Sequence, residues 1–185
     1  MSDLRALGIL LITGMPGAGK STVSRLVAQR LSRAARVDGD TVGEMVLSGR
    51  VKFFEEPADE AARQTELTHR NLCSLAAHFF DAGFTPLIDG VISQRTELER
   101  FVKLLTPRPV FLVVLAPGID VCRHRNRVRD PADRFDFDGY GELDAQMRNE
   151  LGGSGWWFDT SGLREDETAD LLISEAAWRA PVCTP

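Results

Sequence analysis

Two kinds of apolar pattern alternate along the chain. Short runs of consecutive apolar residues, typical of buried strands, occur at 7–13, 35–38, 85–89, 109–115 and 156–159. Segments with apolar residues at helical spacing follow these runs, at 19–32, 58–82, 93–105, 118–127 and 164–178. The alternation predicts a parallel sheet with helices on both faces, a three-layer α/β/α fold with five strands. No linker-like stretch divides the sequence, so we expect a single domain over residues 1–185.

A glycine-rich turn joins the first predicted strand to the first predicted helix. It contains every position of the pattern G-x-x-x-x-G-K-[ST], with a second hydroxyl after it: Gly14, Met15, Pro16, Gly17, Ala18, Gly19, Lys20, Ser21 and Thr22. The glycines let backbone N–H groups turn inward around an anion, and the helix directs its positive dipole end to the same place. Lys20 would reach the β- and γ-phosphates, and the hydroxyl of Ser21 would ligate a Mg²⁺ that bridges them. The turn therefore predicts binding of a nucleoside triphosphate.

Composition and charge narrow the partners that we expect. The net charge of −5 disfavours a general nucleic-acid binder, because such proteins carry a basic face. Three widely spaced cysteines without a C-x-x-C pair are typical of reduced thiols in a cytoplasmic protein. The N-terminus lacks the pattern of a signal peptide, and no apolar stretch is long enough to span a membrane. We therefore expect a cytoplasmic protein, monomeric or homodimeric, without membrane contact.

Two carboxylates flank a glycine at the end of the second predicted strand. Asp38 and Asp40 should face the phosphate loop, because ligands bind beyond the carboxyl ends of parallel strands. We assign Asp40 as the base that accepts a proton from an attacking hydroxyl, and Asp38 as a group on the metal side. An alternative is that Asp40 only caps a helix that begins at Thr41, a common role for aspartate.

The third predicted strand also ends in a carboxylate. Asp89 follows apolar residues there, which fits a Walker-B position that supports Mg²⁺ or its waters. The alternative is an ordinary Asp-Gly turn.

Arginines are concentrated between residues 123 and 134. Arg123 and Arg127 stand four residues apart on one helix face, and Arg134 lies in the loop that follows. We predict a lid over residues 128–139, with Arg123 binding the nucleotide and Arg127 and Arg134 neutralising the transferred phosphoryl group. The alternative is a solvated helix face on which arginines pair with Asp130, Asp133 and Asp136.

The region between the second and third predicted strands, residues 41–82, is predicted to cover an acceptor substrate. Its helical part could instead be an amphipathic helix that simply packs on the core. Four arginines could bind an anionic acceptor or could only keep the surface soluble: Arg50, Arg63, Arg70 and Arg95.

The phosphate loop, Asp38-Gly39-Asp40, Asp89 and the arginines at 123, 127 and 134 together resemble the small P-loop kinases of the nucleoside-monophosphate-kinase-like superfamily. Within it, the chain is most similar to the chloramphenicol phosphotransferase-like and related small-molecule kinases. This resemblance implies a five-stranded parallel sheet in the order 2-3-1-4-5, a lid, and Mg²⁺-ATP as the phosphoryl donor. It also implies direct transfer to a substrate hydroxyl or phosphate. An acidic base favours a hydroxyl, because a carboxylate would repel a phosphate.

Two other functions remain open from the sequence. A regulatory NTP-hydrolysing switch would also need the phosphate loop, but the chain has no Asn-Lys-x-Asp motif for reading guanine. A nucleic-acid end-healing kinase is disfavoured by the acidic balance, although the arginine cluster keeps it open. The leading expectation is a small-molecule kinase, with an antibiotic or a metabolite as acceptor.

Overall fold

A six-stranded sheet forms the centre of the protein. The computed structural model describes residues 8–53, 55–130, 134 and 137–183. Five strands are parallel and lie in the order β2-β3-β1-β4-β5. Their bounds are β1 (Ile9–Thr13), β2 (Ala34–Asp38), β3 (Thr85–Asp89), β4 (Val110–Leu115) and β5 (Trp156–Phe158). The predicted fold class and strand order are therefore confirmed.

Burial explains why the central strands read as uninterrupted apolar runs. Every residue of β1, β3 and β4 is buried, because helices cover both faces of the sheet. β2 lies at the edge, and its burial is only partial apart from Val37. The run predicted at 7–13 begins at residue 7, which lies outside the described residues.

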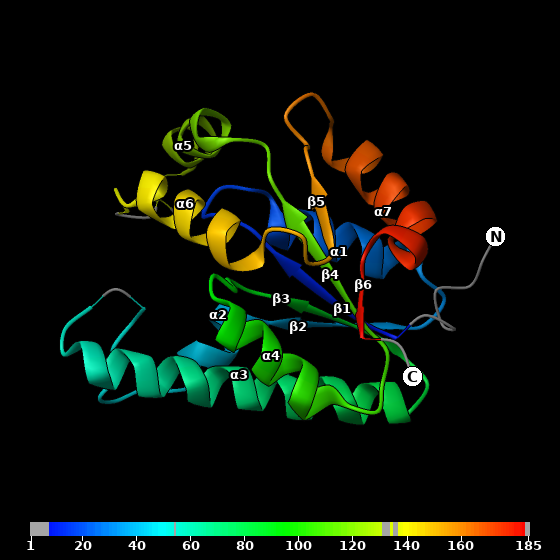
Figure 1. The fold of residues 1–185 in the computed structure, drawn as a ribbon, viewed down its shortest axis with the longest axis horizontal. Helices are drawn as coiled ribbons and strands as arrows, with labels where there is room; N and C mark the ends of the chain where they lie inside the picture. The colour runs from blue at the N-terminus through cyan, green and yellow to red at the C-terminus, as the bar shows by residue number, and fades with distance from the viewer. Residues whose placement is uncertain (1–7, 54, 131–133, 135–136, 184–185) are drawn as a thin grey trace.

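The helices form the two outer layers and a group at the carboxyl edge of the sheet. They are α1 (Lys20–Arg30), α2 (Gly39–Glu44), α3 (Ala58–Asp81), α4 (Arg95–Leu105), α5 (Ile119–Arg127), α6 (Tyr140–Leu151) and α7 (Glu165–Arg179). α3 and α4 pack together on one face, and α1 packs against α7 on the other (Figure 1). α5 and α6 contact each other (Figure 1), and Glu150 of α6 accepts a hydrogen bond from the backbone N–H of Arg95 at the start of α4.

Two elements were not predicted from the sequence. β6 (Pro181–Cys183) pairs antiparallel with the first residues of β4, whereas β5 pairs with the last three. Three residues are too few to show an alternating pattern. α6 does carry a signal, because its buried residues recur at spacings of three and four: Tyr140, Leu143, Met147 and Leu151.

The predicted lid is described only in part. Residues 131–133 and 135–136 lie outside the described residues, so the structure describes the lid at 128–130, 134 and 137–139. Within the described ranges, no helix combines the length and the apolar character that crossing a bilayer requires.

Candidate active site

The phosphate loop lies between β1 and α1, and its backbone has the conformation that its glycines permit. Gly14 and Gly17 have φ angles of 148° and 82°. A Cβ atom on Gly14 would lie 2.5 Å from the carbonyl oxygen of Leu115, and one on Gly17 would lie 2.5 Å from that of Cys122. The loop is therefore held against the end of β4 and the first turns of α5, where a side chain at either glycine would clash.

Lys20 folds back over this loop. Its Nζ atom donates hydrogen bonds to the carbonyl oxygens of Gly14 at 2.8 Å and Met15 at 3.1 Å. Burial lowers the pKa of the ammonium group, while the carboxylates of Asp89 and Asp40 partly offset that effect. Over the described part of the chain, no carboxylate makes a salt bridge with Lys20. A half-buried cation without a direct anionic partner, above a loop of turned backbone, fits a nucleotide phosphate.

Asp38 and Asp89 are paired residues on neighbouring strands, and Arg36 lies between them. Arg36 donates to Asp89 Oδ2 from Nη2 at 2.7 Å and from Nε at 3.1 Å, and its Nη2 also bonds Asp38. Ser24 donates to the same Asp89 oxygen at 2.9 Å. Sequence reasoning missed Arg36 and Ser24, although an arginine two residues before Asp38 on a strand must lie on the same side of the sheet.

The structure assigns the helix-capping role to Asp38. Its Oδ1 atom accepts hydrogen bonds from the backbone N–H groups of Asp40 at 2.9 Å and Thr41 at 3.1 Å, at the start of α2. The alternative in which Asp40 is the cap is therefore wrong. Both oxygens of Asp38 have partners, since Oδ2 bonds Arg36. A part for Asp38 on the metal side stays a prediction.

Asp40 is exposed and lies in the first turn of α2. Desolvation by the surrounding protein raises the pKa of this group, and the carboxylate of Asp38 raises it further, against the opposing charge of Lys20. A carboxylate with a raised pKa accepts a proton at neutral pH more readily than an ordinary aspartate does.

The residues predicted to bind Mg²⁺ occupy compatible positions. Ser21 is in the first turn of α1, and Asp89 is at the end of β3, with its oxygens buried beside the loop. Hydroxyl and carboxylate oxygens are the ligands that Mg²⁺ takes in such sites. The donor set therefore fits this ion, held together with nucleotide phosphates.

The arginines of α5 point in two directions. Arg125, which sequence reasoning passed over, donates from Nη1 to the carbonyl oxygen of Ala18 in the phosphate loop at 3.2 Å. Arg123 and Arg127 instead line a hollow of about 280 Å³ with Arg134, so the predicted trio is brought together. The Arg123 guanidinium lies 5.5 Å from the ring centre of Tyr140 on α6. Asp133 and Asp136, named in the alternative, lie outside the described residues.

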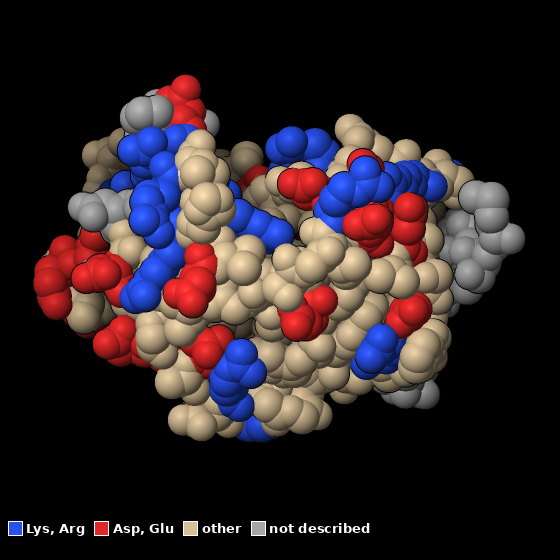
Figure 2. Space-filling view, turned by 90° about the horizontal axis from the view of Figure 1, so that it is seen from above, with Lys and Arg blue, Asp and Glu red and all other residues tan. Residues whose placement is uncertain are grey.

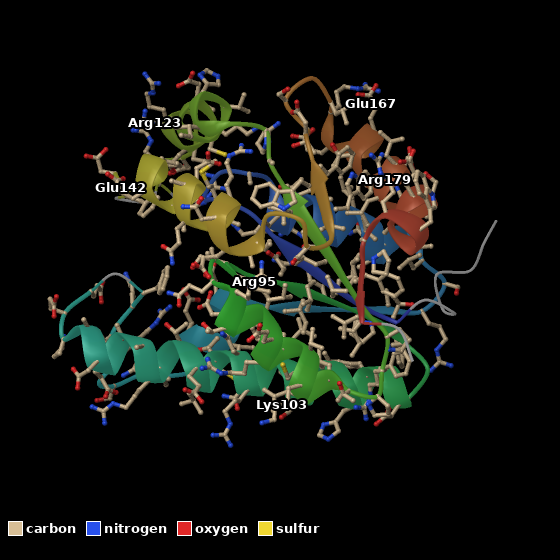
Figure 3. All side chains as sticks on the ribbon, in the orientation of Figure 1. Arg95, Lys103, Arg123, Glu142, Glu167 and Arg179 are labelled. Carbon is tan, nitrogen blue, oxygen red and sulfur yellow. The ribbon has the colours of Figure 1, made fainter. Side chains whose placement is uncertain are left out.

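This arginine hollow gives the site a basic flank. Figure 2 looks down on the molecule from above, and Lys and Arg atoms gather in a band at the left, the side on which α5 lies in Figure 1. Arg123 is labelled on α5 in Figure 3, on that side of the molecule. Phosphate oxygens would meet concentrated positive charge there.

A larger hollow, of about 490 Å³, opens between the amino-terminal half of α3 and the start of α4. Of the four arginines considered for an anionic acceptor, only Arg63 lines it. Arg63 is already paired with Asp59 at 3.0 Å and Glu60 at 3.2 Å. Arg50 is 3.7 Å from Glu44, on α2. The structure does not bring these arginines together as an anion site.

Curated proteins match this chain over part of its length. A UPF0200 protein of Aeropyrum pernix is 33% identical over 87 residues, which are 46% of this chain and 46% of that protein. The chain thus spans less than half the length of this curated relative.

Solved structures match over nearly the whole chain. The tunicamycin resistance protein of Deinococcus radiodurans has a TM-score of 0.62 at 21% identity, covering 96% of this chain and 98% of the other. The shikimate kinase of Acinetobacter baumannii has a TM-score of 0.63 at 18% identity, covering 92% and 93%. At these identities the likeness concerns the fold.

A family model described as an AAA domain matches residues 9–149, which contain the phosphate loop, both strand-tip carboxylate sites and the arginines of α5. The chain therefore belongs to the AAA domain family, and its fold is that of the P-loop kinases.

Proposed function

We propose that the protein is a kinase that transfers the γ-phosphoryl group of Mg²⁺-ATP to a hydroxyl of a small molecule. The observation that carries this proposal is the arrangement at one edge of the sheet, where Lys20 is hydrogen-bonded to the phosphate loop, Asp89 ends β3 and Asp40 lies in the first turn of α2. Both carboxylates act electrostatically on the Lys20 ammonium. A phosphate-binding cation beside an exposed carboxylate supports transfer to an acceptor, because a site for binding alone does not need the carboxylate.

The phosphate loop and Lys20 bind and orient the triphosphate in this proposal. Ser21 and Asp89, with Asp38 nearby, would hold Mg²⁺, which would supply positive charge to the phosphate groups. The acceptor oxygen forms a bond to the γ-phosphorus, and the bond from that phosphorus to the β–γ bridging oxygen breaks. The electron pair of that bond leaves with ADP, and the acceptor proton passes to Asp40.

Arginines complete the arrangement from α5 and the lid. Arg125 holds the loop through the carbonyl of Ala18. Arg123 is proposed to contact the nucleotide, and Arg127 and Arg134 the transferred group once the lid closes. Closure would also exclude water and so limit hydrolysis of ATP.

The test is ADP release measured by a coupled assay with a panel of hydroxylated metabolites, nucleosides and antibiotics. At least one acceptor should raise ADP release above the basal rate. Lys20→Ala should abolish turnover, because the phosphates lose their cation. Lys103→Ala is the matched control, since Lys103 is exposed on α4, on the side of α4 away from α5 and α6 (Figure 3).

Asp40→Asn separates transfer from binding. It should lower the rate of transfer about 10²- to 10⁴-fold, as expected for loss of a general base, and leave nucleotide affinity unchanged. If no acceptor in the panel stimulates ADP release, a nucleotide-hydrolysing switch becomes the better reading of this site.

A further inference from the structure

The 490 Å³ hollow has the size and the position of an acceptor site. Its volume is within the range of small-molecule sites, roughly 300–1,000 Å³. It is bordered by Phe53 and the amino-terminal half of α3 on one side, and by Gln94 and the first turns of α4 on the other. Figure 3 labels Arg95 at that end of α4. A compact organic molecule would fit there.

Contacts connect this hollow to the reacting groups on both sides. Gln94 lies two residues after Ile92, whose backbone N–H donates a hydrogen bond to Thr13 Oγ1 at 2.8 Å. Thr13 is the residue immediately before the phosphate loop. α2, which carries Asp40, packs on α3, and a Cβ atom on Gly43 would lie 3.8 Å from Thr68 Oγ1. Glu66 lines the hollow two residues before Thr68. The hollow therefore adjoins the elements that bear Asp40 and the loop.

The charged side chains of the hollow leave it acidic. Four carboxylates line it, from Glu55, Glu56, Glu66 and Glu97, against the guanidinium groups of Arg63 and Arg100. Both arginines already have carboxylate partners, because Arg63 pairs with residues of its own helix turn and Arg100 lies 3.7 Å from Glu66. The lining therefore has two more negative than positive groups, and one of its four carboxylates, Glu55, lies 4.0 Å from Lys52 just outside the lining.

His69 lies beside the same charged groups, outside the lining of the hollow, and adds no positive charge to it. It is 6% exposed, its ring packs on Phe101 with 4.8 Å between the ring centres, and its charged neighbours are Glu97, Arg100 and Glu66. Burial lowers the pKa of His69, so the imidazole is neutral at pH 7. Its Nδ1 atom is buried and has no hydrogen-bond partner in the part of the chain that the structure describes.

We infer that the acceptor carries an ammonium group beside its hydroxyls, as an amino sugar or an aminocyclitol does, and that an anionic acceptor is rejected. The inference rests on the proposed kinase function. An ammonium group compensates the surplus carboxylates, whereas a carboxylate or phosphate of the ligand would face like charges in a partly enclosed site. Phe53 and the alanines of α3 offer an apolar wall for the C–H face of a ring.

The test compares an amine, a neutral compound and an acid within each of two series of polyhydroxylated molecules. One series is glucosamine, glucose and gluconate, and the other is 2-deoxystreptamine, myo-inositol and quinate. Binding to the full chain with Mg²⁺-ADP is measured by equilibrium dialysis, and transfer is measured with Mg²⁺-ATP by ADP release. At least one amine should bind about tenfold or more tightly than the acid of its series. Stronger binding of the acids, or no binding of either amine, would overturn the inference.

Variants make the charge argument specific. Glu56→Gln and Glu66→Gln should each weaken amine binding about two- to fivefold, without change in ADP affinity. Glu66→Gln also removes the partner of Arg100, so it should raise the affinity for the acid of the same series. Glu99→Gln, an exposed residue of α4 outside the hollow, is the matched control. Equal effects of all three variants would contradict the assignment of this hollow.

The two proposals fail in different ways. Amines that bind but never stimulate ADP release would refute the kinase and leave the acidic site in place. Acids that stimulate ADP release better than amines would support the kinase and refute the acceptor class.

Discussion

Replacing Arg36 with methionine tests whether the ion pairs behind the site stabilise the protein. Asp89 is 3% exposed, and Arg36 is its cationic partner, with two hydrogen bonds to one oxygen. Arg36 itself is 19% exposed and also bonds Asp38. Methionine would keep much of the length and apolar stem of the side chain, but it would leave a buried carboxylate with only Ser24 as a side-chain partner.

The magnitude follows from the cost of an uncompensated buried charge. Removing one partner of a fully buried pair costs roughly 3–5 kcal/mol. The partial exposure of Arg36 and Asp38 and the remaining bond from Ser24 reduce this, so we expect a loss of about 2–4 kcal/mol in the free energy of unfolding. For a chain of this size the melting temperature should fall on the order of 10 °C.

The assay is urea and thermal unfolding at pH 7, followed by circular dichroism. Arg63→Met is the matched control, because Arg63 also pairs with two carboxylates but is 71% exposed, and it should cost less than about 1 kcal/mol. The double variant Arg36→Met/Asp89→Asn should recover part of the loss, since the orphaned charge is removed. If Arg36→Met unfolds at the same urea concentration as the wild type, the reasoning is refuted.

Three further predictions concern Asp40, Arg125 and the buried thiols. Asp40→Asn should be more stable than the wild type at pH 7 and equal to it near pH 3. The pKa of Asp40 in the folded protein is higher than the ordinary value of 3.8, so ionisation of Asp40 favours unfolding. This loss of stability is absent below pH 3.8 and grows as the pH rises from 3.8 to the pKa of the folded protein. Lower stability of this variant in urea at pH 7 would contradict that sign. Arg125→Ala should weaken ATP binding by roughly tenfold in calorimetry, because the phosphate loop loses its hydrogen bond at Ala18. Arg100→Ala is the control and should leave ATP binding unchanged. An unchanged affinity in Arg125→Ala would make Arg125 a packing residue only. Burial raises the pKa of the Cys73 thiol to about 12 and of Cys122 to about 11, so both should resist iodoacetamide at pH 8 until the protein is unfolded, as read by mass spectrometry; rapid labelling of the folded protein would count against the burial argument.

Local sequence patterns were sufficient to predict the central strands and the phosphate loop. Consecutive apolar runs predicted β1, β3 and β4, because a strand covered on both faces needs apolar residues at every position. The phosphate loop was readable for a similar reason, since its conformation depends on glycines within a few residues of each other. β6 was missed because three residues carry no period, and the helix signal of α6 was overlooked.

Only the tertiary structure decided how the side chains of the site divide their roles. The sequence by itself determined that Asp38, Asp40 and Asp89 lie at strand ends, but pairing of β2 with β3 places Asp38 beside Asp89 with Arg36 between them. The sequence likewise located an arginine cluster, but only the packing of α5 on the phosphate loop shows that Arg125 contacts the loop, through the carbonyl oxygen of Ala18. The physical reason is range: backbone conformation follows from neighbours along the chain, while a charge takes its partner from whichever element is packed against it.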